Sequence, residues 1–166
     1  MMSKHSLTAV QEDYLEAIYR LQLETSGQDV RVSDIAARLG TKLPTVTRAV
    51  RRLSVIELLH HPLRGRVRLS GSGRQMAVEI VHRHDDIVSF FVEVLGLRLT
   101  EAELDACRIE HGISARTAQR LHDFLEHFAT LSRADQKRFG GSAKRGTGLP
   151  GHFQSLTKSR VNGWRT

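Results

Sequence analysis

Residues 31–53, RVSDIAARLGTKLPTVTRAVRRL, decide the fold of the first part of this chain. Apolar side chains recur at helical spacing on both sides of Gly40, which predicts two short helices joined by a tight turn. Pro44 is compatible with the second helix because it falls in the first helical turn. The residues expected to form the interior are Val32, Ile35, Ala36, Leu39, Val46, Val50 and Leu53. This pattern predicts a helix-turn-helix.

The second helix, from about residue 42 to residue 53, is the one that enters the major groove in such motifs. Its side chains expected to face DNA are Lys42, Pro44, Thr45, Thr47, Arg48 and Arg51. The following segment, LLHHPLRGRVRLSGSG at 58–73, predicts two short strands around residues 62–65. Arg64, Arg66 and Arg68 alternate there, so they can face one side and contact phosphates or the minor groove. A winged helix is favoured over a solvated basic hairpin.

A second informative stretch is CRIEH at residues 107–111. A capping box of Thr100 with Glu103 and a terminating Gly112 predict that this stretch is helical. The thiol, the carboxylate and the imidazole then stand at i, i+3 and i+4 on one helical face and can bind one metal ion. Those three residues are Cys107, Glu110 and His111.

Two other segments offer further ligands. Asp13 and Glu16 are i and i+3 on a helix opened by Thr8 and Gln11, and His84 lies in a long amphipathic segment at about 73–95. Ordinary structural roles remain open at this point. A lone cysteine is often a small core residue, carboxylates in a first helical turn favour the helix dipole, and the aspartates at 85 and 86 can make His84 a surface ion-pair member.

Composition bounds the class of protein. The 166 residues include 40% hydrophobic residues, so the chain can form one domain or two small ones. A net charge of +7 indicates a polyanionic partner, and the single cysteine excludes an internal disulfide. No apolar run reaches the roughly 20 residues of a membrane helix, and residues 1–13 lack the apolar core of a signal peptide, so we expect a cytoplasmic protein.

The whole chain is predicted to be mainly α, with a winged helix-turn-helix domain at 7–72 and an all-helical domain at 73–131. The second domain carries more apolar residues than a half-chain of this size buries alone, so we infer a symmetric dimer. Residues 132–166 are rich in glycine, serine and basic residues and are expected to form a flexible tail. The apolar residues concerned are Ile87, Phe90, Phe91, Val94, Leu95, Leu97, Leu104, Leu121, Phe124 and Leu125.

Several stretches together resemble the iron- and manganese-dependent repressor family, the diphtheria-toxin-repressor and manganese-transport-regulator group. They are EDYLEAIYRL, VSDIAARLG, PTVTRAVRRL, RLSGSG, RHDDIVSFF and DACRIEHGIS, in that order. The resemblance covers about residues 7–128. It implies a winged-helix domain joined to a helical dimerisation domain, with a divalent metal ion bound as corepressor.

Carried over position by position, the family's metal ligands are Asp13, Glu16, His84, Cys107, Glu110 and His111. The implied partners are double-stranded operator DNA and a second copy of the chain, with no membrane and no organic cofactor. Manganese-type members have a carboxylate where this chain has Cys107, and iron-type members have a methionine where it has Asp13. Both Mn²⁺ and Fe²⁺ are therefore kept. Val88 and Glu103 leave the ancillary site of iron-type members incomplete.

The leading hypothesis is a metal-activated repressor of metal-uptake genes. A second is a metal-independent winged-helix regulator that senses a small molecule or an oxidant through Cys107. A third is a metal-dependent hydrolase, with Glu110 as general base and His84 and His111 as ligands. The chain lacks the paired-histidine motif with a nearby glutamate that zinc hydrolases carry, which disfavours the third.

Overall fold

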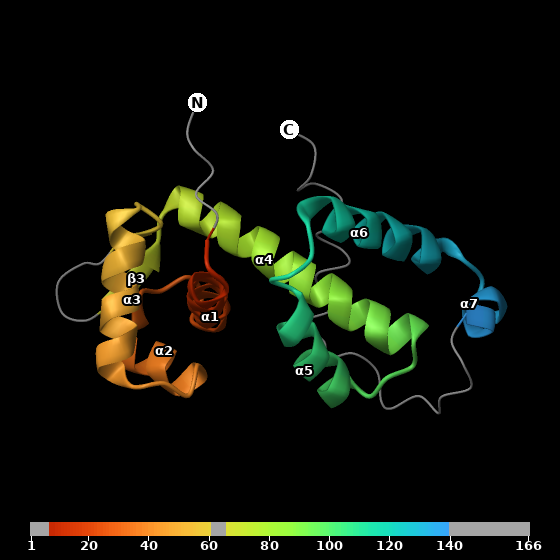
Figure 1. Ribbon diagram of the computed structural model, residues 1–166, viewed down its shortest axis with the longest axis horizontal. Helices are drawn as coiled ribbons and strands as arrows, with labels where there is room; N and C mark the ends of the chain where they lie inside the picture. The colour runs from red at the N-terminus through yellow and green to blue at the C-terminus, as the bar shows by residue number, and fades with distance from the viewer. Residues whose placement is uncertain (1–6, 61–65, 140–166) are drawn as a thin grey trace. The chain divides into compact units, whose positions relative to one another are not determined.

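The computed structural model describes residues 7–60 and 66–139, which are mainly helical. The chain divides into two compact units, residues 1–82 and residues 83–166. The division falls inside one helix, α4 (Gly71–Ser89), which Figure 1 draws as a continuous ribbon. In the described part of the chain, no helix is both long enough and apolar enough to cross a membrane.

Three helices build most of the first unit: α1 (Ala9–Glu24), α2 (Val32–Arg38) and α3 (Leu43–Val55). The capping box expected at the start of α1 is confirmed. The Thr8 hydroxyl accepts from the Gln11 N–H at 3.3 Å, and the Gln11 side chain accepts from the Thr8 N–H at 2.9 Å. Gly40 has φ +58° in the turn between α2 and α3, a conformation that favours glycine. The predicted helix-turn-helix is present.

The apolar face predicted for these helices forms the core of the first unit. Five of the seven expected interior residues are buried, and Ala36 and Leu39 pack partly buried against them. Leu15 and Ile18 of α1 belong to the same buried cluster. The buried five are Val32, Ile35, Val46, Val50 and Leu53. This packing leaves the polar face of α3 exposed.

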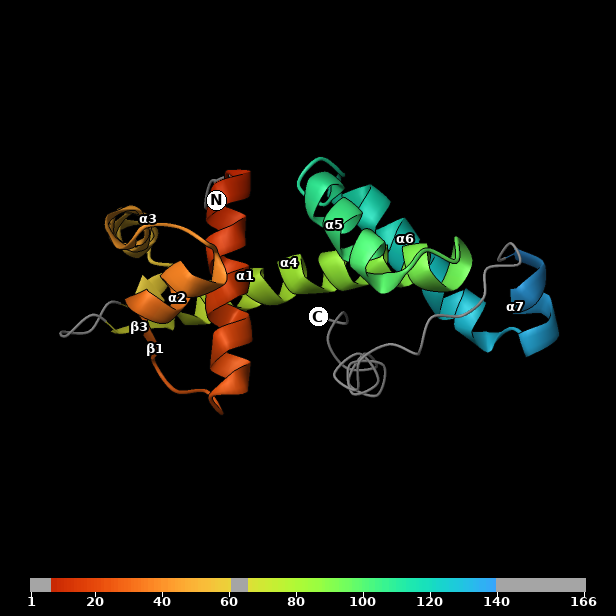
Figure 2. The same cartoon turned by 90° about the horizontal axis from the view of Figure 1, so that it is seen from below.

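A small antiparallel sheet has the strand order β1-β3-β2. The predicted strands are confirmed as β2 (Leu59–His60) and β3 (Arg66–Leu69), with Leu59 opposite Leu69. The strand β1 (Val30–Arg31) was not predicted; it pairs with β3 and leads directly into α2 (Figure 2). The expected wing turn, which includes Arg64, lies outside the described residues.

The second unit contains the end of α4, a π-helical turn η1 (Phe90–Val94), and the helices α5 (Leu99–Ile109), α6 (Ala115–Thr130) and α7 (Arg133–Phe139). Ile87 and Val88 of α4 pack with Ala102 and Ala106 of α5. A second cluster joins η1 to α6. Ser114 is a residue type that opens helices, and the sequence predicts that a third helix of this unit begins there. The cap is confirmed, since the Ser114 hydroxyl accepts from the Thr117 N–H at 3.2 Å.

The predicted start of α5 was wrong by one to two residues. The N-cap is Arg98 rather than Thr100, and the Glu101 carboxylate accepts from the Arg98 guanidinium at 2.6 Å and from its backbone N–H at 3.4 Å. These contacts with Arg98 lower the pKa of Glu101, so this carboxylate stays ionised in the first turn, where the helix dipole favours it. The end of α5 also differs from the prediction, because the helix stops at Ile109 and not just before Gly112.

The expectation of a flexible tail from residue 132 was wrong at its start, since residues 133–139 form α7. Ser132 opens this helix by accepting from the Asp135 N–H at 3.2 Å. The Phe139 ring packs edge-on against Phe128 of α6, with 6.1 Å between the centroids. An aromatic contact 11 residues away in sequence is not visible in local composition. Residues 140–166 lie outside the described part of the chain.

Candidate metal centre

Glu110 is one of the charged residues of the second unit whose carboxylate is almost fully buried. It follows the last residue of α5 as the C-cap, with helical backbone angles, and it is 1% exposed. Burying a carboxylate is costly unless hydrogen-bond donors or cations compensate it. The surroundings of Glu110 therefore determine what this site can bind.

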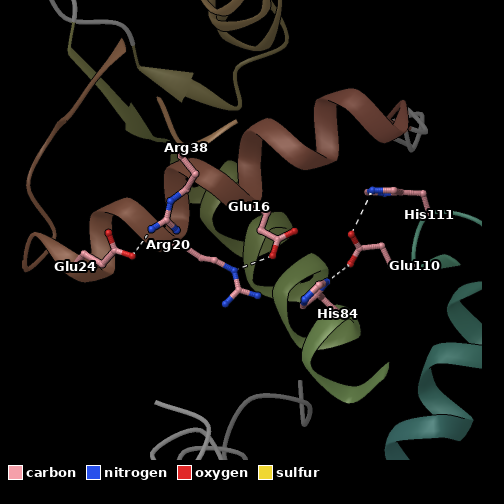
Figure 3. A network of polar contacts seen from close by, with 7 residues as sticks. All are labelled: Glu16, Arg20, Glu24, Arg38, His84, Glu110 and His111. Atoms are coloured by element: carbon pink, nitrogen blue, oxygen red, sulfur yellow. Dashed lines mark hydrogen bonds and ion pairs between the residues drawn. The ribbon is translucent and has the colours of Figure 1, made fainter. Parts of the chain in front are cut away.

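Two histidines approach the two oxygens of this carboxylate (Figure 3). His84 Nδ1, from α4, lies 2.8 Å from Glu110 Oε2, and His111 Nε2 lies 3.4 Å from Glu110 Oε1. The His84 side chain is 9% exposed and that of His111 17% exposed. Two imidazoles around one buried carboxylate form a compact set of nitrogen and oxygen donors.

Cys107 adds a sulfur donor one helical turn before Glu110. One donor atom each from His84, Cys107 and Glu110 lies within 4.8 Å of the other two. Neighbouring ligands of an ion with bonds of about 2.0–2.3 Å stand roughly 3–4 Å apart, so donors already gathered within 4.8 Å of one another can converge on one ion. The donor types and their spacing therefore fit a divalent transition metal.

Four of the six predicted ligands are thus gathered in the second unit. The i, i+3, i+4 argument placed Cys107, Glu110 and His111 on one helix, whereas the structure places Glu110 and His111 just after the end of α5. The other two, Asp13 and Glu16, lie on α1 in the first unit, where both are partly buried. Their i, i+3 spacing on a helix is confirmed by the bounds of α1.

Two contacts were missed in the sequence. Arg20 donates from Nε to Glu16 Oε1 at 2.7 Å, a pairing that the i, i+4 spacing on α1 signals. Asp86 is 5% exposed and pairs with His122 of α6 at 3.0 Å. The surface role considered for the aspartates at 85 and 86 was therefore wrong, because α4 packs that face inward. No local signal connects residues 86 and 122.

The second candidate site is the exposed face of α3, which contains three arginines and no acidic residue. Five of its six predicted DNA-facing residues are exposed, namely Lys42, Pro44, Thr45, Arg48 and Arg51. Thr47 differs: it is half-buried, and its hydroxyl donates to the Leu43 carbonyl at 3.0 Å. On β3, Arg66 and Arg68 are exposed while Val67 and Leu69 are buried, as the alternation predicted. Arg68 pairs with Asp29 at 2.5 Å.

Comparison with known proteins identifies the class. Residues 6–65 match the model of the iron dependent repressor N-terminal DNA binding domain, and residues 70–137 match the iron dependent repressor metal binding and dimerisation domain. The chain belongs to this family of metal-dependent transcriptional repressors. Its members are DNA-binding, dimerising regulators and not enzymes, so the hydrolase interpretation is set aside.

Particular relatives agree with this assignment. An uncharacterized HTH-type transcriptional regulator of Methanocaldococcus jannaschii is 32% identical over 117 residues, 70% of this chain and 93% of the relative. The regulator MntR of Bacillus subtilis is 34% identical over 122 residues, 73% and 83% of the two chains. A solved manganese-dependent transcriptional repressor in complex with manganese is 34% identical, with a TM-score of 0.64. That match covers 70% of this chain and 52% of the solved repressor, so this chain spans about half the length of that repressor.

Proposed function

We propose that this protein is a dimeric repressor of metal-uptake genes that binds operator DNA when a divalent metal ion is bound. One observation carries the proposal: the buried Glu110 carboxylate lies between two imidazoles, with the Cys107 thiol in the same cluster. A structural role alone does not require nitrogen, oxygen and sulfur donors gathered this closely.

The proposed ligands are the six predicted residues Asp13, Glu16, His84, Cys107, Glu110 and His111. The contacts within the second unit support the last four, and the family resemblance supports the two on α1. The family resemblance implies that a bound divalent ion supplies positive charge to both sets of ligands. The ligands on α1 and those around Glu110 would then favour one arrangement of the two DNA-binding domains, which is a population shift toward the DNA-competent dimer.

Both Mn²⁺ and Fe²⁺ remain in the proposal. Manganese is the ion named for the similar manganese-dependent repressor, and carboxylate ligands such as Asp13, Glu16 and Glu110 suit this ion. The Cys107 sulfur, a softer donor, favours iron over manganese. The two ions are separated by the free concentration at which each one induces DNA binding.

We propose that α3 enters the major groove. The exposed cations at this helix, Lys42, Arg48 and Arg51, contact phosphates or base edges. Arg66 and the wing residue Arg64 contact the DNA backbone beside the groove. Lys42 and Pro44 lie where the helix begins, the end that reaches base edges in such motifs. This assignment accounts for the absence of acidic side chains on α3.

The helical unit is proposed to hold the dimer contact. Several large apolar side chains of the second unit are exposed, including Leu95 at 49%, Leu104 at 62% and Phe124 at 37%. Large exposed apolar side chains are the kind of residue that a protein interface covers. The corresponding domain limits are 7–72 for DNA binding and 73–131 for metal binding and dimerisation, followed by the basic residues 132–166.

The test is DNA binding by the full chain to its own upstream promoter region under anaerobic conditions. Mn²⁺ and Fe²⁺ are titrated separately, beside a chelated sample and a Glu103→Gln control, which changes an exposed carboxylate of α5. We expect binding only with metal, in wild type and control alike. Equal binding in the chelated sample would refute metal activation and favour the regulator that senses an oxidant through Cys107.

A further inference from the structure

The pairing of Glu16 with Arg20 on α1 is chemically at odds with metal binding by Glu16. Arg20 Nε donates to Glu16 Oε1 at 2.7 Å, one helical turn along α1 (Figure 3). The side chains are only 23% and 14% exposed, respectively, so solvent screens this pair less than a surface ion pair. Glu16 therefore already has a cationic partner within its own helix.

The arginine cannot give way by losing its charge. A guanidinium stays protonated at any physiological pH, so Arg20 keeps a positive charge beside the carboxylate. A divalent cation that binds Glu16 must displace this guanidinium from Oε1, or bind with a positive charge nearby. Either course makes metal binding less favourable than it would be at a carboxylate without a neighbouring cation.

We propose that Arg20 is an internal competitor for the divalent cation at Glu16 and thereby sets the metal affinity of the α1 half of the site. The inference rests on the proposed function, because it takes Glu16 as a ligand. In the metal-free protein Arg20 neutralises Glu16. When a divalent cation binds there, Arg20 leaves Oε1 and turns toward solvent.

An opposite role for Arg20 makes an opposite prediction. A residue that orients a ligating carboxylate strengthens metal binding, and its loss typically weakens affinity 10–100-fold. A competitor weakens metal binding, and its loss strengthens affinity. The dissociation constant for the metal ion therefore falls on removal of Arg20 if this residue is a competitor, and rises if it orients Glu16.

The chain offers a matched control on the same helix. Glu24 of α1 pairs with Arg38 of α2, an arginine–glutamate pair that involves no proposed ligand (Figure 3). Mn²⁺ binding is measured by electron paramagnetic resonance of the free ion for wild type, Arg20→Gln and Arg38→Gln. We expect the dissociation constant to fall about tenfold in Arg20→Gln, the scale of one partly buried ion pair. Arg38→Gln should match wild type.

Two further measurements assign the effect to Glu16. In a Glu16→Gln background, Arg20→Gln should no longer change Mn²⁺ affinity, because the competed oxygen is gone. Raising the salt concentration from about 0.1 M to about 1 M should narrow the gap between wild type and Arg20→Gln, since screening weakens the ion pair in wild type. The variant Arg20→Lys, which keeps the charge, should stay near wild type. Circular dichroism verifies that each variant is folded.

An unchanged or higher dissociation constant in folded Arg20→Gln would overturn the inference, as would an equal effect in Arg38→Gln. Failure of the proposed function is recognised separately with Glu110→Gln. If Mn²⁺ binding does not depend on Glu110, the metal centre itself is wrong. If it depends on Glu110 but not on Arg20, only the competition is wrong.

Discussion

Glu110 concentrates the chemistry of the proposed centre in one side chain. Its carboxylate is 1% exposed and lies between His84 and His111. Replacement by Gln keeps the shape but removes the charge and one acceptor. We expect Glu110→Gln to weaken Mn²⁺ or Fe²⁺ binding by at least about 100-fold and to abolish metal-dependent DNA binding in a folded dimer.

Isothermal titration calorimetry measures the metal affinity of this variant, and electrophoretic mobility shift measures its DNA binding. The control is Glu103→Gln, which alters an exposed carboxylate of the same helix. Full metal dependence in Glu110→Gln would contradict the ligand assignment.

Gly73 is the residue at which side-chain volume is least tolerated. A Cβ added there would lie 1.9 Å from the Leu58 carbonyl oxygen, a contact between rigid backbone segments that cannot yield cheaply. We expect Gly73→Ala to lower the free energy of unfolding by about 3 kcal/mol. Nothing lies within 4 Å of the corresponding position at Gly71, so Gly71→Ala should be close to neutral.

Urea unfolding followed by circular dichroism checks both glycine variants. Equal stability of the two would show that the Leu58 backbone moves aside. The clash arises because the Gly73 turn of α4 packs directly on the segment before β2, a contact absent from any local sequence pattern.

Among the elements, α3 concentrates positive charge on the face that its core packing leaves exposed. Val46, Val50 and Leu53 point inward, so Arg48 and Arg51 point outward. We expect Arg48→Ala and Arg51→Ala each to weaken operator binding. Each substitution that removes a contact with one phosphate should reduce the slope of the log binding constant against the log salt concentration by about one. Metal affinity should not change, because neither residue is a proposed ligand.

Fluorescence anisotropy with labelled promoter DNA at several salt concentrations measures these changes. Arg120→Ala on α6 removes an exposed arginine outside the DNA-binding unit and is the matched control. A fall in metal affinity in the Arg48 or Arg51 variant would contradict the placement of the DNA-contacting face.

Helix periodicity predicted α1, α3 and α6 because their apolar stripes are local features, although Lys42, the N-cap of α3, forms no side-chain cap. Thr8 and Ser114 occupy the expected cap positions. Two elements were missed because each depends on a contact with residues distant in sequence. β1 is two residues long and exists only because β3 pairs with it, whereas α7 is stabilised by packing of Phe139 on Phe128.

For the whole molecule, the exposed apolar side chains of the helical unit are the feature that a monomer does not explain. Leu104 is 62% exposed on α5. We expect Leu104→Glu to raise the dimer dissociation constant at least tenfold, because a charge would enter an apolar interface. Analytical ultracentrifugation measures this equilibrium, with the neighbouring Glu103→Gln as control. A dimer of unchanged affinity would place the interface elsewhere on the unit.

The sequence by itself determined the winged helix, the inward and outward faces of α3, and the side chains proposed to bind metal. These follow from side-chain periodicity, glycine and proline positions, and the chemistry of the donors, all of which act over a few residues. Only the tertiary structure decided which donors meet. His84 and Glu110 are 26 residues apart, and their 2.8 Å contact requires α4 and the end of α5 to pack together. Asp86 is likewise buried and pairs with His122 of α6, because burial depends on neighbouring helices rather than on residue type.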